Sequence, residues 1–242
     1  GGGILNSAAK LAGLSEDDLF ERSLDRLQRA QSLGTCSFEI KSGYGLAPEQ
    51  EIKMLRVIRR LAAHTGLPIR STFLGAHSYP LPYRENHRVY LDQLIRDMLP
   101  AIAEEGLADY IDVFCEKGFF SPKETGEILE AGIEHGLIPR IHTNQFTSSG
   151  GIDLAIQMGA RSVDHLEVLD DREIALLAGS EVFPVLLPLA AFFMNLHDPP
   201  ARRMIEAGLP LVIASDYNPG TSPSPDMNLI FALSCIRMRL LP

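Results

Sequence analysis

Short runs of apolar residues alternate along the chain with longer stretches in which apolar residues recur every three or four positions. The short runs are typical of strands buried in a parallel sheet, and the longer stretches are typical of amphipathic helices that cover such a sheet. The pattern predicts strands at residues 36–40, 69–74, 110–115, 138–141, 162–165, 182–187 and 211–215. A helical stretch follows each strand, and one more helix, over residues 15–33, precedes the first.

Repeated strand–helix units predict an α/β fold with a parallel sheet and helices outside it. Seven units are one fewer than the eight of a closed (β/α)8 TIM barrel, and a helix comes first when the first strand of such a barrel is missing. An open doubly wound sheet is the alternative, but it places its site at one switch point, whereas polar residues here follow nearly every strand. We expect residues 1–242 to form a single, incomplete barrel domain.

Three of the predicted strands lead into residues with metal-binding chemistry. His142 and His165 end two of them, and Asp216 follows the apolar run before the turn that Asn218 begins. Barrel enzymes keep catalytic groups at the carboxyl ends of their strands. Two imidazoles and a carboxylate suit one divalent metal ion and an activated water. Because side chains alternate along a strand, we expect Asp164 and His165 to face opposite sides, with His165 toward the barrel interior.

Five strings of residues carry a resemblance to a known family: EIKSGYGL (39–46), TFLGAH (72–77), IHTNQF (141–146), SVDHLEV (162–168) and SDYNPGTSP (215–223). In this order they closely resemble the imidazolonepropionase family of the amidohydrolase superfamily. The combination of SGYGL with DYNPG is specific, whereas His and Asp at strand ends fit many amidohydrolases. The resemblance implies an enzyme of histidine degradation that hydrolyses the cyclic amide of 4-imidazolone-5-propanoate to N-formimidoyl-L-glutamate, using one bound zinc or iron ion.

The resemblance also implies roles for individual residues. His142 and Asp216 match metal ligands, His165 matches the histidine beside the attacking water, and Asp216 is also expected to move the water's proton. The positions that match substrate contacts are Tyr44, His77, Gln145, Asn218, Gly220 and Thr221. The last three are expected to hold the glutamate-like end of the substrate.

Two departures from the family pattern stand out. The His-x-His pair that normally supplies two more metal ligands from the first strand is absent, as is the β-sandwich that the family builds from its termini. Both are expected if the chain is an internal portion of a longer protein. The second departure is at residues 144 and 145, where Asn144 and Gln145 stand in place of the Asp-Glu of many relatives, so that a carboxylate is missing. Glu167, two residues beyond His165, is a candidate to restore it.

Charge and cysteine content narrow the partners and the compartment. A net charge of −9 and a pI near 5.3 argue against nucleic acid or an anionic membrane as the main partner. Three separated cysteines and no signal-peptide pattern fit the cytoplasm. We expect a small-molecule substrate and, because an unclosed barrel exposes two sheet edges, a homodimer as a candidate assembly.

Alternative functions remain open at this level. A different cyclic amidohydrolase, or a deaminase of the same superfamily, would use a similar set of strand-end residues. A third interpretation is a fragment with weak catalysis and low metal affinity, because half of the usual metal ligands are missing. The sequence does not distinguish zinc from iron.

Overall fold

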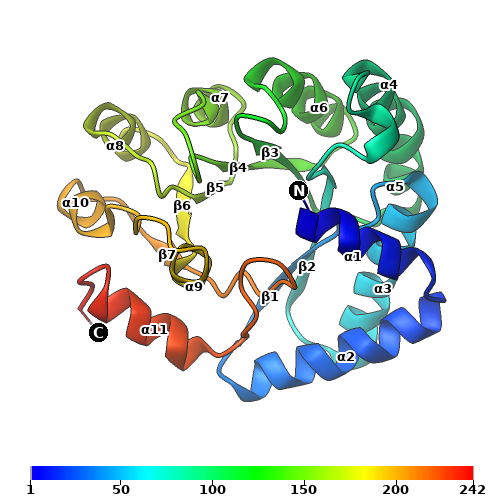
Figure 1. Ribbon diagram of the computed structural model, residues 1–242, viewed down its shortest axis with the longest axis horizontal. Coiled ribbons are helices and arrows are strands. Elements are labelled where there is room, and N and C mark those ends of the chain that lie inside the picture. Colours follow the sequence, from blue (N-terminus) through cyan, green and yellow to red (C-terminus); the bar gives the residue numbers. More distant parts are fainter. Residues whose placement is uncertain (1, 242) are drawn as a thin grey trace.

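The computed structural model describes residues 2–241, and these residues contain one curled seven-stranded sheet with helices outside it (Figure 1). Its strands are β1 (Phe38–Lys41), β2 (Ile69–Ala76), β3 (Tyr110–Cys115), β4 (Ile138–Thr143), β5 (Ser162–His165), β6 (Phe183–Leu186) and β7 (Val212–Ile213). Every neighbouring pair is parallel and follows the order of the chain. The predicted incomplete barrel is therefore confirmed, with β1 and β7 as the edges of the described sheet.

Most of the helices lie on the outside of the curled sheet (Figure 1). They are α2 (Glu16–Ser32), α3 (Pro48–Thr65), α4 (His87–Gln93), α5 (Leu99–Glu105), α6 (Pro122–Glu134), α7 (Gly151–Gln157), α8 (Asp171–Ala178), α10 (Ala201–Glu206) and α11 (Met227–Ile236). Three begin at side-chain caps: Ser15 accepts a hydrogen bond from the Asp18 N–H, and Ser121 and Asp170 form capping boxes.

Two helices were not predicted from the sequence. The first, α1 (Gly2–Ala12), starts with two glycines and precedes the clear periodicity of α2. Lys53 of α3 donates hydrogen bonds to the carbonyl of Leu11, in the last turn of α1, and to that of Leu14, just beyond it, so α3 fixes the end of α1. The second, α9 (Pro188–Phe193), has only six residues and follows β6 directly. A continuous apolar run of this length does not distinguish a helix from a strand.

The helix predicted over residues 88–105 is interrupted. A π-helical turn at Leu94–Met98 separates α4 from α5. Pro100 stands in the first turn of α5 and has no N–H to donate to the preceding turn. The irregular turn therefore has an identifiable cause in the sequence.

Alternation along the strands separates an apolar outer layer from a polar interior. In β3, Ile111 and Val113 belong to the apolar core, which also contains residues of the surrounding helices. Asp112 and Phe114 point the other way and contact side chains of other strands, including His142 of the neighbouring β4. The register pairs His142 with Phe114 of β3 and with Asp164 of β5. Side chains of neighbouring parallel strands in register share a face, so the interior groups meet above β4.

Candidate active site

The carboxyl ends of the strands carry a concentration of backbone strain. Four non-glycine residues at or just beyond the ends of β4, β5 and β7 have positive φ: Asn144 (57°), His165 (89°), Leu166 (69°) and Asp216 (49°). Each such conformation costs about 1–3 kcal/mol, and such residues cluster at active sites and ligand clamps. The backbone thus singles out the same end of the barrel as the polar residues do.

Four side chains of the predicted site lie together at this end. The ring centroids of His142 and His165 are 5.3 Å apart, and those of His142 and His77 are 6.4 Å apart. Tyr44 contacts His77 edge to face, with ring centroids 5.2 Å apart. Phe114 of β3 lies 6.2–6.3 Å from all three histidine rings, so the cluster rests on an aromatic side chain.

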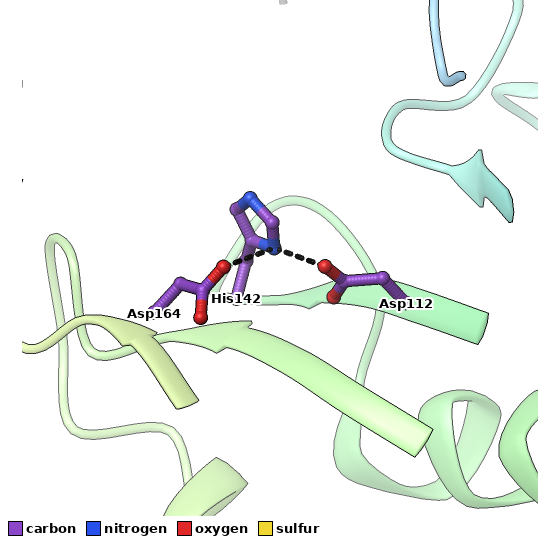
Figure 2. Close-up of side chains that lie close together, drawn as sticks. All are labelled: Asp112, His142 and Asp164. Carbon is purple, nitrogen blue, oxygen red and sulfur yellow. Dashed lines mark ion pairs between the residues drawn. The ribbon is translucent and has the colours of Figure 1, made fainter. Parts of the chain in front are cut away.

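His142 is held between two carboxylates on one side of its ring (Figure 2). Its Nδ1 lies 2.9 Å from Oδ2 of Asp112 and 4.0 Å from Oδ2 of Asp164. The shorter contact has the distance of an ion pair but not the alignment of a hydrogen bond. Figure 2 shows the other ring nitrogen, Nε2, directed away from both carboxylates. Nε2 is therefore the atom of His142 that is available to a ligand.

Beneath His142 lies a buried ionic network, formed by side chains of β1, β3, β4 and β5. Lys41 Nζ is 2.9 Å from Asp112 and 3.4 Å from Asp164, and Arg140 is 3.0 Å from Glu39 and 3.3 Å from Asp164. Burial raises the pKa of Asp164, but Arg140 and Lys41 outweigh it and hold that pKa at about 2. Burial likewise raises the pKa of Asp112, but the neighbouring His142 and Lys41 outweigh it and hold that pKa well below its usual range.

Asp112, His142 and Asp164 could hold a metal ion, because one ligand atom from each lies within 4.8 Å of the others. The ammonium group of Lys41 already lies against both carboxylates, so the protein itself supplies positive charge at this place. Sequence reasoning missed Asp112, although a lone aspartate within an apolar strand is a signal of an interior polar group.

Asp216 offers a further carboxylate near the histidines, separate from Asp112 and Asp164. Burial among protein atoms raises its pKa, whereas His165 and His142 lower it, and the net shift is upward. The residue keeps part of its surface exposed and receives a hydrogen bond at Oδ2 from Asn218 Nδ2, 3.1 Å away. A carboxylate whose charge is incompletely balanced beside two imidazoles is a place that a cation would stabilise. An imidazole nitrogen and a carboxylate are ligands that suit a divalent metal, and the binding of one ion by His142 Nε2 and Asp216 together stays a prediction.

The prediction that Asp164 and His165 face opposite sides is wrong. Asp164 joins the interior network through Arg140 and Lys41, and His165 also turns inward, toward His142. The φ of +89° takes His165 out of the strand conformation. Alternation therefore stops at the last residue of β5.

Glu167 lies beside His165 and is almost completely buried. Its Oε1 is 3.5 Å from His165 Nδ1, and neither carboxylate oxygen has a hydrogen-bond partner among residues 2–241. Burial lowers the pKa of His165, but Glu167, helped by Asp216 and Asp164, outweighs burial and raises that pKa to about 9. In the metal-free protein His165 thus carries a proton at neutral pH, with Glu167 as its counterion.

The loop after β4 contains two amides in different roles. Asn144 is fully buried and structural: its Nδ2 donates to the Val168 carbonyl (2.8 Å) and to Glu173 (2.9 Å). Gln145 is also buried, and its Nε2 lies 3.6 Å from Met194 Sδ. Glu116, which sequence reasoning missed, accepts a hydrogen bond from the Phe146 N–H and orders this loop.

The turn after Asp216 is organised by Asn218. Its Oδ1 accepts hydrogen bonds from the N–H groups of Gly220 and Thr221, each 2.8 Å away. Its Nδ2 donates to the Asp216 carbonyl at 2.7 Å. These turn N–H groups already have a partner, so a substrate carboxylate would have to share them with Asn218 or replace it. The binding roles of Asn218, Gly220 and Thr221 stay predictions.

Comparison with known proteins relates the chain to one group of enzymes in sequence. No family model matches the chain. The chain is 52% identical over 242 residues to the imidazolonepropionase of Flavobacterium johnsoniae and 50% identical over 242 residues to that of Christiangramia forsetii. It is 44% identical over 241 residues to that of Paracidovorax citrulli. The chain is homologous to imidazolonepropionases along its whole length. It spans 58–59% of the length of these imidazolonepropionases.

Solved structures of other hydrolases share the fold at low sequence identity. An adenine deaminase from Arthrobacter aurescens has a TM-score of 0.70 and 19% identity, covering 97% of this chain and 72% of its own. A zinc-bound adenosine deaminase from Xanthomonas campestris has a TM-score of 0.68 and 12% identity, covering 95% of this chain and 53% of its own. These similarities show the barrel fold alone, whereas the imidazolonepropionases named above are also similar in sequence.

Proposed function

We propose that this chain forms the barrel of an enzyme that hydrolyses the cyclic amide of 4-imidazolone-5-propanoate to N-formimidoyl-L-glutamate. The observation that carries the proposal is the 52% identity, over all 242 residues, to a protein named imidazolonepropionase. The gathering of His77, His142 and His165 at one end of the barrel supports it. The deaminases share only the fold, at 12–19% identity, and no feature of the site favours their reaction.

We propose that His142, through Nε2, and Asp216 hold one divalent metal ion, either zinc or iron. When bound, such an ion supplies a nucleophilic water at neutral pH and polarises the amide carbonyl. The presence of zinc in solved structures of the same fold supports a divalent metal here. The ionic network below keeps Asp112 and Asp164 ionised next to Nδ1, which favours a proton on Nδ1 and leaves Nε2 free for the metal.

The other residues of the chain move protons and hold the substrate. Asp216 accepts the proton of the attacking water and delivers it to the ring nitrogen as the carbon–nitrogen bond breaks. Protonated His165 donates a hydrogen bond to the oxygen on which negative charge develops. Tyr44, His77 and Gln145 contact the ring. The turn formed by Asn218, Gly220 and Thr221 holds the propanoate.

The proposed partner is thus a small molecule and not nucleic acid or a membrane. Among residues 2–241, no helix combines the length and the apolar character needed to cross a membrane. The cytoplasmic location and the homodimer stay predictions.

The reaction is tested with the purified protein in its complete natural form. We expect it to remove the ultraviolet absorbance of imidazolonepropanoate, to release N-formimidoyl-L-glutamate, and to leave adenine, guanine and cytosine unchanged. Deamination of any of these bases without turnover of imidazolonepropanoate would assign the barrel to the deaminases instead.

A further inference from the structure

The loop that carries Tyr44 is held by a buried carboxylate from the next helix. Glu51, in the first turns of α3, is fully buried and accepts three backbone hydrogen bonds. Its Oε2 accepts from the Gly43 N–H at 2.8 Å, and its Oε1 accepts from the N–H groups of Gly45 (2.7 Å) and Leu46 (2.8 Å). A carboxylate with three N–H donors is a strong, charge-assisted clamp, so the backbone is held both before and after Tyr44.

The same loop fixes a proton on His77. The Nδ1 of His77 lies 3.0 Å from the carbonyl oxygen of Gly43. A carbonyl oxygen only accepts, so Nδ1 carries the hydrogen in this contact. Burial, with a smaller effect of His142, lowers the pKa of His77 to about 3, so the ring is neutral. A neutral imidazole with its proton on Nδ1 presents a lone pair on Nε2. No hydrogen bond joins Nε2 to any of residues 2–241.

Gly43 cannot be replaced without moving His77. Its φ of +97° is a conformation that favours glycine. A Cβ at this position would lie 2.8 Å from the Leu74 carbonyl oxygen and 3.1 Å from His77 Nδ1. The loop and the imidazole are therefore packed as one unit.

We propose that Glu51 is a positioning residue: by holding the backbone N–H groups of Gly43, Gly45 and Leu46, it fixes the Gly43 carbonyl that lies between them, keeps the proton of His77 on Nδ1 and makes Nε2 an acceptor for an N–H group of the substrate ring. The identity of that ring rests on the proposed function, because imidazolonepropanoate carries a ring N–H donor. Glu51 does not touch the substrate and acts only through the loop backbone and His77. The site would therefore prefer a substrate ring that presents an N–H group to His77 Nε2 over a ring that presents only hydrogen-bond acceptors to it.

The substitution Glu51→Gln tests the clamp, because the glutamine amide has the size of the carboxylate but replaces one acceptor oxygen with an NH2 donor. If its oxygen keeps the two hydrogen bonds to Gly45 and Leu46, its NH2 faces the Gly43 N–H and that hydrogen bond is lost. Glu49→Gln is the matched control, since Glu49 is exposed on the same helix and the change in charge is the same.

The ring nitrogens of His77 are observed by ¹⁵N NMR in the complete protein, with His77→Gln used to assign the signals. In the wild type and in Glu49→Gln we expect a neutral ring with its proton on Nδ1. In Glu51→Gln we expect a share of the Nε2–H form and a rise of about tenfold in KM for imidazolonepropanoate, with kcat changed less, as for one lost hydrogen bond to the substrate. A wild-type His77 with its proton on Nε2 would overturn the proposal, as would a Glu51→Gln variant with the wild-type tautomer and KM.

Hydrogen exchange of the Gly43 amide in the wild type keeps the idea testable if Glu51→Gln does not fold. Strong protection supports the clamp, and exchange at the rate of an exposed amide contradicts it. The tautomer measurement needs no substrate. A protein with the expected tautomer that leaves imidazolonepropanoate intact would refute the proposed function and support the role of Glu51.

Discussion

At the scale of single residues, the strand-end histidines and Asp216 could be identified from the sequence, but their supports could not. His142 and His165 stand at the ends of recognisable strands, so parallel topology predicts that they converge. Asp112 and Glu51 belong to no local motif. Their roles depend on contacts with His142, 30 residues from Asp112, and with Gly43, 8 residues from Glu51. Local patterns fix elements, whereas such contacts depend on how the elements pack.

The environment of Glu167 indicates a functional role. Its carboxylate is buried beside His165 and has no hydrogen-bond partner among the described residues. In the metal-free protein, we expect His165 to titrate near pH 9 in the wild type and at a clearly lower pH in Glu167→Gln. The folded-state pKa is above the ordinary value of about 6.5. The stability that this pair contributes is therefore complete below about pH 6.5 and is lost as the pH rises through 9.

NMR titration of the His165 ring measures this directly, with Glu181→Gln as an exposed control. The same Glu167→Gln variant is expected to lose at least about tenfold in kcat, because protonated His165 no longer faces the developing charge. Equal titration midpoints in the wild type and the variant would remove Glu167 from the site.

At the scale of elements, the period of apolar residues predicted all seven strands and most helices. Strands β3 and β5 have the predicted bounds, whereas β7 is only Val212–Ile213 instead of residues 211–215. At the edge of the sheet, β7 pairs with β6 alone, and fewer ladder hydrogen bonds define it. The short helix α9 could not be predicted because six apolar residues carry no period.

The packing of α6 against β3 gives a stability prediction. A Cβ on Gly132 would lie 2.5–3.1 Å from atoms of the buried Ile111 side chain. We expect Gly132→Ala to lower the free energy of unfolding by about 1–3 kcal/mol, as overpacking does. Gly126→Ala on the same helix meets its nearest atom at 3.7 Å and should be neutral or stabilise by up to about 1 kcal/mol. Urea denaturation of both variants compares them, and a Gly132→Ala variant as stable as the Gly126→Ala variant would contradict this packing.

At the scale of the whole molecule, the seven strands form a curled sheet with two edges, and the chain spans about 59% of its curated relatives. Two metal ligands hold an ion more weakly than four, and unpaired edges favour association. We therefore expect residues 1–242, produced alone, to show low metal affinity, low activity and a tendency to associate. Metal analysis after dialysis and light scattering measure these properties, and stoichiometric tight zinc with full turnover would contradict the expectation.

The position of the metal ion is the central claim. Anomalous scattering at the zinc or iron absorption edge, from crystals of the complete protein, locates the ion without any variant. The account predicts an ion within about 2.0–2.2 Å of both His142 Nε2 and a carboxylate oxygen of Asp216. An ion on the Nδ1 side, between Asp112 and Asp164, or one out of reach of Asp216, would contradict it.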